Sequence, residues 1–139
     1  MANEAILRDR LEHPIDFTIP NAQAVEKGSL MSLHDPRICS GARIPAQVIA
    51  GIAAREKVAN DGRTQLAVFR KGIFDMVASG AITIGAPVMS ASDGTWTNTI
   101  KQALGIAASG AVIIGHSLET AADAERVQIF LNVGAGTPL

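Results

Sequence analysis

The stretch TQLAVFRKGIFDMVASGAITIGAPVMSA, residues 64–91, constrains most strongly what this chain can fold into. Its first half, residues 65–77, is rich in β-branched and aromatic residues and is interrupted by Gly72, which disfavours a helix. A Ser-Gly pair then predicts a turn, and residues 81–90, which include Gly85, resume as a second apolar strand. The stretch therefore predicts the buried central hairpin of a small β domain, with a bulge or bend at Gly72.

Further strands are predicted on both sides of this hairpin. Apolar and polar residues alternate over residues 15–20 and again over residues 127–133, as they do in half-buried strands. Residues 37–45, which hold Cys39, are instead predicted to form a loop. The remaining short strands are expected at residues 28–33, 47–54, 95–100, 102–108 and 111–115. The chain is thus predicted to be all-β, either a small β-barrel or a sandwich.

Tight turns are predicted where Asp-Gly pairs separate these strands. Asp61-Gly62 and Asp93-Gly94 are such pairs, and they supply the left-handed backbone geometry that a tight turn needs. Together with Gly72 and Gly85, these residues are expected to have structural roles as turns or bends.

A weak internal repeat suggests that the β domain has two related halves. Three short segments recur in the same order: AGIAA (50–54) as LGIAA (104–108), GSLMS (28–32) as GAPVMS (85–90), and QLAVF (65–69) as RVQIF (126–130). Two copies of one unit would form a barrel or sandwich with pseudo-symmetry. The alternative is chance similarity, because short strands share residue preferences.

Residues 1–14 are predicted to form an arm that precedes a single β domain, residues 15–139. Asn3 is a candidate N-cap for a short helix, and Pro14 would end that helix. The helix would carry its apolar residues, Ile6, Leu7 and Leu11, on one face. Because so short a helix is marginal alone, the arm is either a partly ordered tail or a segment that orders on a partner.

No catalytic, metal or cofactor site is predicted. His13, His34 and His116 are scattered, without a second ligand at a spacing typical of zinc sites. Gly115-His116-Ser117 lacks the second glycine of a nucleophile elbow. Arginines near Cys39 would lower its pKa, but no histidine is placed by the sequence to act as its base, so an inert thiol is the favoured interpretation.

Composition excludes several classes of partner. A net charge of −1 offers no basic stripe for nucleic acid, and an aromatic content of 4% offers few rings for stacking bases or sugars. One cysteine permits no internal disulfide. We expect no secretory signal and no membrane span, since the apolar runs are short and broken by glycine. A hydrophobic content of 47% suggests that some apolar surface lies against another chain.

The segments DGRTQLAVFRKGIFDMVASGAITIGAPVMSASDG and ALGIAASG carry a resemblance to a known family. The pattern resembles that of the capsid decoration proteins of tailed bacteriophages, also called cement or head-stabilising proteins. Its parts, in order, are a strand that runs into KGIF, a G-x-I-x-x-G-x-P-V-like segment, an Asp-Gly turn and a G-I-A segment. The resemblance covers roughly residues 15–133 and leaves the arm outside it.

This resemblance implies a structural virion protein made in the host cytoplasm. Such proteins bind the outer surface of the expanded phage capsid, bridge neighbouring major capsid subunits and stabilise the head, commonly as trimers. The arm residues Ile6, Leu7 and Leu11 are then candidates for capsid contact. Two other classes remain open: a different assembly component, such as a tail-tube subunit or a head-fibre base, and an enzyme, which ranks last because no catalytic constellation is visible.

Overall fold

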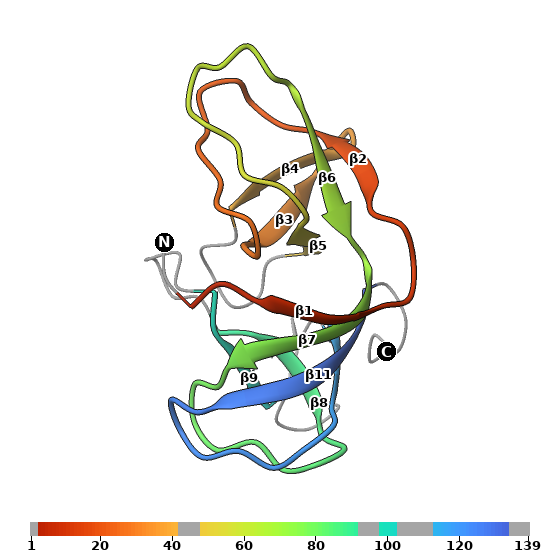
Figure 1. Ribbon diagram of the computed structural model, residues 1–139, viewed down its shortest axis with the longest axis vertical. Helices are drawn as coiled ribbons and strands as arrows, with labels where there is room; N and C mark the ends of the chain where they lie inside the picture. Colours follow the sequence, from red (N-terminus) through yellow and green to blue (C-terminus); the bar gives the residue numbers. More distant parts are fainter. Residues whose placement is uncertain (1–2, 42–47, 92–97, 103–112, 134–139) are drawn as a thin grey trace.

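The computed structural model describes residues 3–41, 48–91, 98–102 and 113–133, which form two β-sheets and no helix (Figure 1). The first sheet closes into a barrel in the order β2-β4-β3-β5-β6. Its strands are β2 (Ile15–Thr18), β3 (Leu30–His34), β4 (Ile38–Gly41), β5 (Ile49–Ala53) and β6 (Gln65–Phe69). The predictions of an all-β fold and of a small barrel are confirmed.

The second sheet has six strands in the order β1-β7-β11-β10-β8-β9 and lies below the barrel in Figure 1. It is antiparallel throughout its named strand pairs. Its strands are β1 (Ile6–Arg10), β7 (Lys71–Val77), β8 (Pro87–Ser90), β9 (Ile100–Gln102), β10 (Gly115–Ser117) and β11 (Arg126–Asn132).

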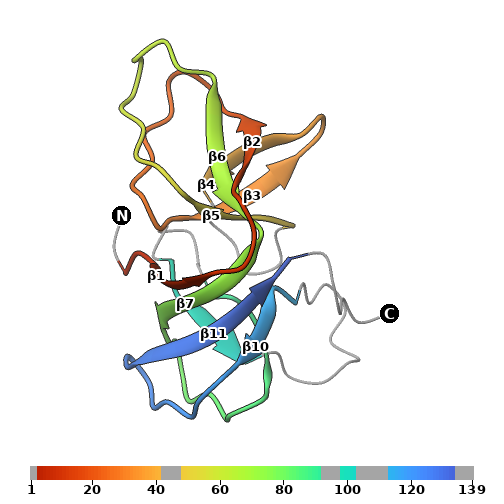
Figure 2. The same ribbon diagram turned by 45° about the vertical axis from the view of Figure 1, so that its right-hand side comes forward.

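The chain crosses from the barrel to the second sheet at Arg70. This residue separates β6 from β7, and Figures 1 and 2 show the two arrows joined by a short curved segment as the chain passes from one sheet to the other. The bend expected at Gly72 therefore falls earlier, and Gly72 lies inside β7. The predicted central hairpin is wrong: β7 pairs with β1 and β11, whereas β8 pairs with β9 and β10. An apolar strand finds its partner by tertiary packing, so adjacency along the chain did not decide the pairing.

The internal repeat is present in the strand pairing. Strands β2 to β6 and strands β7 to β11 follow the same scheme: the first strand pairs with the fifth, the second with the third and fourth, and the fourth with the fifth. Isolated bridges recur as well, with Val25 and Lys57 in the first half matched by Ile82 and Ala121 in the second. We refer below to these halves as the N-half (15–69) and the C-half (71–133).

The structural register of the repeat differs from the sequence register at one segment. A Cβ atom on Gly51 would lie 2.0 Å from the carbonyl oxygen of Phe69, and one on Gly115 would lie 2.0 Å from that of Phe130. Gly115, rather than Gly105, is therefore the counterpart of Gly51. The correspondence of residues 65–69 with 126–130 agrees with the structure, since β6 and β11 hold equivalent places.

The two halves pack against each other through strands β3 and β5, whose side chains alternate between two cores. In β3 and β5, successive side chains face either the barrel interior or a core shared with the second sheet. Met31 and Ala50 belong to the barrel core, whereas Leu30, Ile49 and Ile52 belong to the shared core. The shared core also includes the rings of Phe69 and Phe74, which meet edge to face with centroids 5.7 Å apart. Strand β5 is consequently buried at all of its positions.

Two local predictions are corrected. The helix expected in the arm is instead strand β1, because β7 offers it a ladder of backbone hydrogen bonds that a short isolated helix cannot match. The loop expected around Cys39 contains strand β4, which pairs with β3 and buries the thiol completely. The expected turn Asp93-Gly94 and most of the strands expected over residues 102–115 lie outside the described residues.

Candidate functional site

Strand β1 places the arm along the outer edge of β7. The Ala5 amide donates a 2.8 Å hydrogen bond to the Gly28 carbonyl of the N-half, and Arg126 of the C-half donates to the Glu4 carbonyl at 3.3 Å. Arg8 forms an ion pair with Asp75 at 3.5 Å. The arm thus contacts both halves, although its strand residues are all exposed.

The three apolar arm residues do not share a face. Ile6 is paired with Asp75 on the outer side of β7, and Leu7 is paired with Phe74 on the core side, because neighbouring residues of a strand point in opposite directions. Leu11 follows the strand. Ile6 and Leu11 are 45% and 47% exposed, and Leu7 is 36% exposed. Ile6 and Leu11 are therefore the better placed to meet another molecule.

The predicted turn and bend residues occupy different environments. Asp61 accepts a hydrogen bond from the Arg63 amide, and Gly62 and Gly85 have φ of +83° and +81°. A Cβ atom on Gly72 would lie 3.0 Å from the Phe74 ring and 3.1 Å from the Asp9 carbonyl oxygen, so this glycine allows β1 to approach β7. We expect valine at Gly72 to destabilise the fold by more than about 1 kcal/mol.

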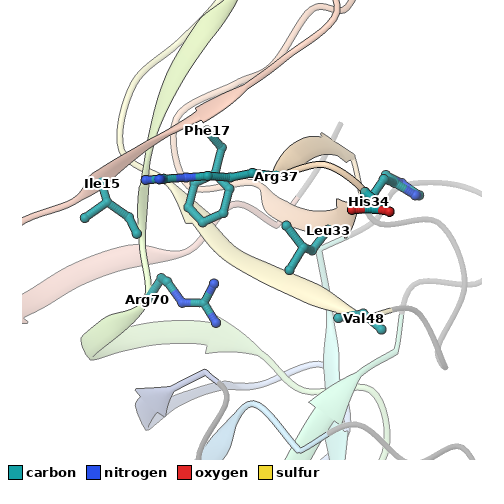
Figure 3. Close-up of a pocket in the computed structure, with 8 residues that line it drawn as sticks. Ile15, Phe17, Leu33, His34, Arg37, Val48 and Arg70 are labelled. Carbon is teal, nitrogen blue, oxygen red and sulfur yellow. The ribbon is translucent and has the colours of Figure 1, made fainter.

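A shallow depression of about 490 Å³ opens on the side of the barrel near the crossing between the sheets (Figure 3). Its apolar members include Ile15 and Val48, which are 42% and 56% exposed. Its charged members are Arg37, Arg70 and Asp35. We call it the Phe17 depression; it is lined by Ile15, Phe17, Leu33, His34, Asp35, Arg37, Val48 and Arg70.

Two guanidinium groups lie against one ring in this depression. The Cζ atom of Arg37 lies 5.3 Å from the centroid of the Phe17 ring, and that of Arg70 lies 5.8 Å from it. Phe17 itself is buried, whereas Arg37 is exposed and Arg70 is half-buried; Figure 3 shows both arginine side chains beside the Phe17 ring. The depression is suited to hold an apolar or acidic side chain of another protein. Its residues come from distant strands, so no spacing in the sequence indicated it.

Hydroxyl and imidazole groups meet beside this depression. His34 Nε2 lies 3.0 Å from Ser32 Oγ and 2.9 Å from Ser40 Oγ, and the two hydroxyl oxygens are 2.9 Å apart. Such contacts arise because Ser32 and Ser40 are directly paired across β3 and β4. Ser32 is fully buried and also donates to the Ser40 carbonyl, so its hydroxyl serves the strand pair.

Cys39 is embedded in the barrel core. Burial raises the pKa of its thiol to about 11, which opposes the lowering that nearby arginines suggested in the sequence. His13 and His116 are exposed and far apart in the chain; Arg10 donates a hydrogen bond to His13. Within the described ranges, no group of three His, Cys, Asp or Glu side chains is arranged to hold a metal ion. The same residues contain no helix long and apolar enough to cross a membrane.

Comparisons with known proteins agree with the fold. The model of the phage cement protein family matches residues 10–133. Among solved structures, the chain is similar to the crystal structure of the head fiber gp8.5 N base of bacteriophage phi29, with a TM-score of 0.56, 16% sequence identity, and coverage of 85% of this chain and 93% of that chain. No curated protein matches it in sequence. The family match begins at the end of β1, so most of the arm precedes it.

Proposed function

This chain belongs to the phage cement protein family, and from that premise we propose that it binds the outer surface of the expanded phage capsid, bridges major capsid subunits and stabilises the head. Membership makes it a structural protein of the phage head. The match over residues 10–133 is the observation that carries the proposal, because it spans both halves of the fold.

Mass action explains how such a protein stabilises a shell. A ligand that binds the assembled lattice but not its opened form lowers the free energy of the assembled form by RT ln(1 + [L]/Kd) at each site. Many equivalent sites on one shell multiply this effect. A protein of this kind therefore needs only moderate affinity at each site.

The exposed arm residues supply a candidate contact with the capsid. Ile6 and Leu11 present aliphatic side chains from the edge of the second sheet, where β1 holds the arm against both halves. Burial of each aliphatic side chain contributes roughly 1.5–3 kcal/mol before any ordering cost is subtracted. Because β1 is already ordered as a strand, less entropy is lost on binding than a disordered tail would lose.

Co-sedimentation with expanded and unexpanded capsids tests this proposal. The native protein should sediment with expanded capsids and should raise their thermal midpoint. The Ile6→Ser and Leu11→Ser variants should bind at least about tenfold more weakly. Ile84→Ser is the matched control, because Ile84 is an equally aliphatic and 62% exposed side chain of the C-half. Failure of the native protein to bind capsids would overturn the proposal, and equal binding by all variants would exclude the arm.

Deletion of residues 2–13 provides a second test of the arm. The sequence predicts that the arm is separable from folding, and the exposure of β1 is compatible with that prediction. We expect the truncated protein to fold and to bind expanded capsids more weakly. If it fails to fold, the contacts of Ala5 with Gly28 and of Arg126 with Glu4 make the arm part of the core.

We further propose that the protein assembles as a homo-oligomer, in line with the trimers common in decoration proteins, and that it has no catalytic role. Sedimentation equilibrium would distinguish a closed trimer from a monomer. Combined alanine substitutions at Cys39, His34 and His116 should leave capsid binding within a few-fold of native. A loss of more than about tenfold, roughly 1.4 kcal/mol, would reveal a functional site at these residues.

A head-fibre base is the second candidate function, favoured by the fold likeness to the phi29 head fiber base. A fibre base attaches a projecting structure to the head, and that role requires no stabilisation of the lattice. Capsid melting therefore distinguishes the two functions. If bound protein leaves the thermal midpoint of the expanded capsid unchanged, the fibre-base function is favoured.

A further inference from the structure

Four basic side chains converge on a second depression, on the side of the barrel that faces the end of β1. Arg10 closes β1, Lys27 precedes β3, and Arg55 and Arg63 belong to the connection between β5 and β6. The depression has a volume of about 500 Å³, and all four basic side chains are exposed. We call it the basic depression.

Charge is unbalanced in the basic depression. Glu56 is the one carboxylate among its lining residues, so four positive charges and one negative charge leave a local charge of +3, in a chain whose net charge is −1. The ion pairs among the described residues are Arg8 with Asp75 and Lys57 with Asp61, and they include none of the four basic side chains. Exposed cations of one sign gathered in a concave site concentrate their field there.

The remaining contacts of these side chains leave their charges available. The guanidinium of Arg10 donates to the His13 ring, and that of Arg63 donates to the Glu56 carbonyl at 3.5 Å, so neither of these contacts is with a carboxylate. Phe69, which is 7% exposed, forms part of the wall. The Phe17 depression is a weaker anion site by comparison, because it balances two arginines against Asp35 and places both guanidiniums on a ring.

We propose that the basic depression binds an acidic, Asp- or Glu-rich peptide segment of the capsid partner. This inference rests on the proposed function, which supplies a protein lattice as the partner. Arginine favours carboxylates because its planar fork can bond both oxygens at once, and three of the four cations are arginines.

A protein segment fits these observations better than a nucleic acid does. Outside the basic depression the chain carries a charge of −4, since −1 minus +3 is −4, and this charge repels a long polyanion. The aromatic residue in the wall is almost wholly buried and cannot stack on a base. A short acidic segment would place its charges in the depression without approaching the rest of the surface.

Charge reversal within and outside the basic depression tests the inference. The Arg55→Glu/Arg63→Glu variant should bind expanded capsids at least about tenfold more weakly at low salt. The Lys71→Glu/Lys101→Glu variant is the matched control, because it makes the same change in net charge at two basic residues of the C-half. Native binding should weaken as NaCl rises from about 50 to 300 mM, and the Arg55→Glu/Arg63→Glu variant should show a smaller salt dependence. Equal losses in both variants would overturn the inference.

Direct binding of simple probes separates this inference from the proposed function. Titration with a poly-glutamate peptide should saturate the native protein and the control variant, and Arg55→Glu/Arg63→Glu should abolish the signal. Preference for a DNA duplex of equal charge would overturn the acidic-peptide assignment. If the native protein binds poly-glutamate but no capsid, the proposed function fails, and the binding of acidic peptide by the basic depression stands. If it binds capsids and ignores poly-glutamate, the inference fails and the proposed function stands.

Discussion

The N-half and the C-half share one pairing scheme, but among the described residues only the N-half is closed as a barrel by pairs between its named strands. In the N-half, β2 meets β4 through the parallel pair Thr18 and Ile38. The equivalent parallel bridge of the C-half joins Ala78 to Ile100 beyond the end of β7, and β1 occupies the edge of β7 instead. The comparison shows that the C-half carries an added, exposed strand on its first strand, whereas in the N-half the first strand pairs with strands of its own unit.

The bridge that recurs in both halves is built from different chemistry. In the N-half it contains Lys57, which is only 2% exposed. Its ammonium donates to the carbonyl oxygens of Asn21, Gln23 and Val58 at 2.7, 3.0 and 3.2 Å, and it lies 3.2 Å from Asp61. In the C-half the equivalent residue is Ala121, which packs in the shared core. A polar anchor therefore holds the long loops of the N-half, where the C-half uses apolar packing.

The largest expected effect comes from adding one methyl group at the equivalent glycines. Gly51→Ala and Gly115→Ala each place a Cβ atom 2.0 Å from a backbone carbonyl oxygen, which neither sheet can accommodate without moving a strand. We expect each to lower the free energy of unfolding by about 3 kcal/mol or more, measured by urea unfolding. Gly62→Ala is the control: it has open space around its Cβ position, so only its φ of +83° opposes alanine, which we expect to cost about 1 kcal/mol. A small effect at only one of the two glycines would show that the halves are not mechanically equivalent.

Lys57→Met should weaken the N-half selectively. It keeps the aliphatic stem but leaves buried carbonyl oxygens without their donor, which we expect to cost about 2–3 kcal/mol. The buried Cys39 thiol, with its pKa of about 11, reports on opening of the barrel through its rate of alkylation. Lys57→Met should accelerate this reaction, and Lys101→Met should not. Equal rates in both variants would contradict an anchoring role.

A smaller effect distinguishes the glycines that precede β3 and β8. Gly28 and Gly85 have φ of +91° and +81°, so alanine at either is strained by about 1 kcal/mol. A Cβ atom on Gly28 would also lie 2.4 Å from the Ala5 carbonyl oxygen, whereas Gly85 has open space. We therefore expect Gly28→Ala to lower the thermal midpoint more than Gly85→Ala does. Deletion of the arm should make the two effects similar, and a persistent difference would contradict this explanation.

The smallest expected effect is an acid dependence that arises from Asp61 in the N-half. The hydrogen bond from the Arg63 amide, with help from the Lys57 ammonium, lowers the pKa of Asp61 below its usual 3.8. The stability from this carboxylate is present above the unfolded-state pKa and is lost as the pH falls through the lower folded-state pKa. Asp61→Asn should therefore lower the thermal midpoint at about pH 7 and should match the native protein near pH 2. A difference that persists at low pH would assign the effect to packing.

Parts of the fold followed directly from local patterns. Alternation predicted β2 and β11 because one face of each is buried, and side chains on a strand alternate between two faces. The repeat of residues 65–69 at 126–130 identified equivalent strands, since both copies meet the same packing demand. Short, broken apolar runs and a scarcity of helix-favouring periodicity were enough to predict an all-β chain.

Other features depended on which distant segments meet. Residues 6–10 have no strong preference of their own, and the open edge of β7 made them a strand. Arg37 and Arg70 lie on Phe17, and four basic residues gather around Phe69, only because the barrel closes and the end of β1 lies against it. The amino-acid sequence by itself thus determined the class of fold and the alternating strands, because these follow from interactions between near neighbours. It indicated the duplicated unit, and the strand pairing established it. The tertiary structure decided the strand partners, the place of the arm and both depressions. Backbone pairing is nearly independent of side-chain identity, so packing across the whole molecule selects which strands pair.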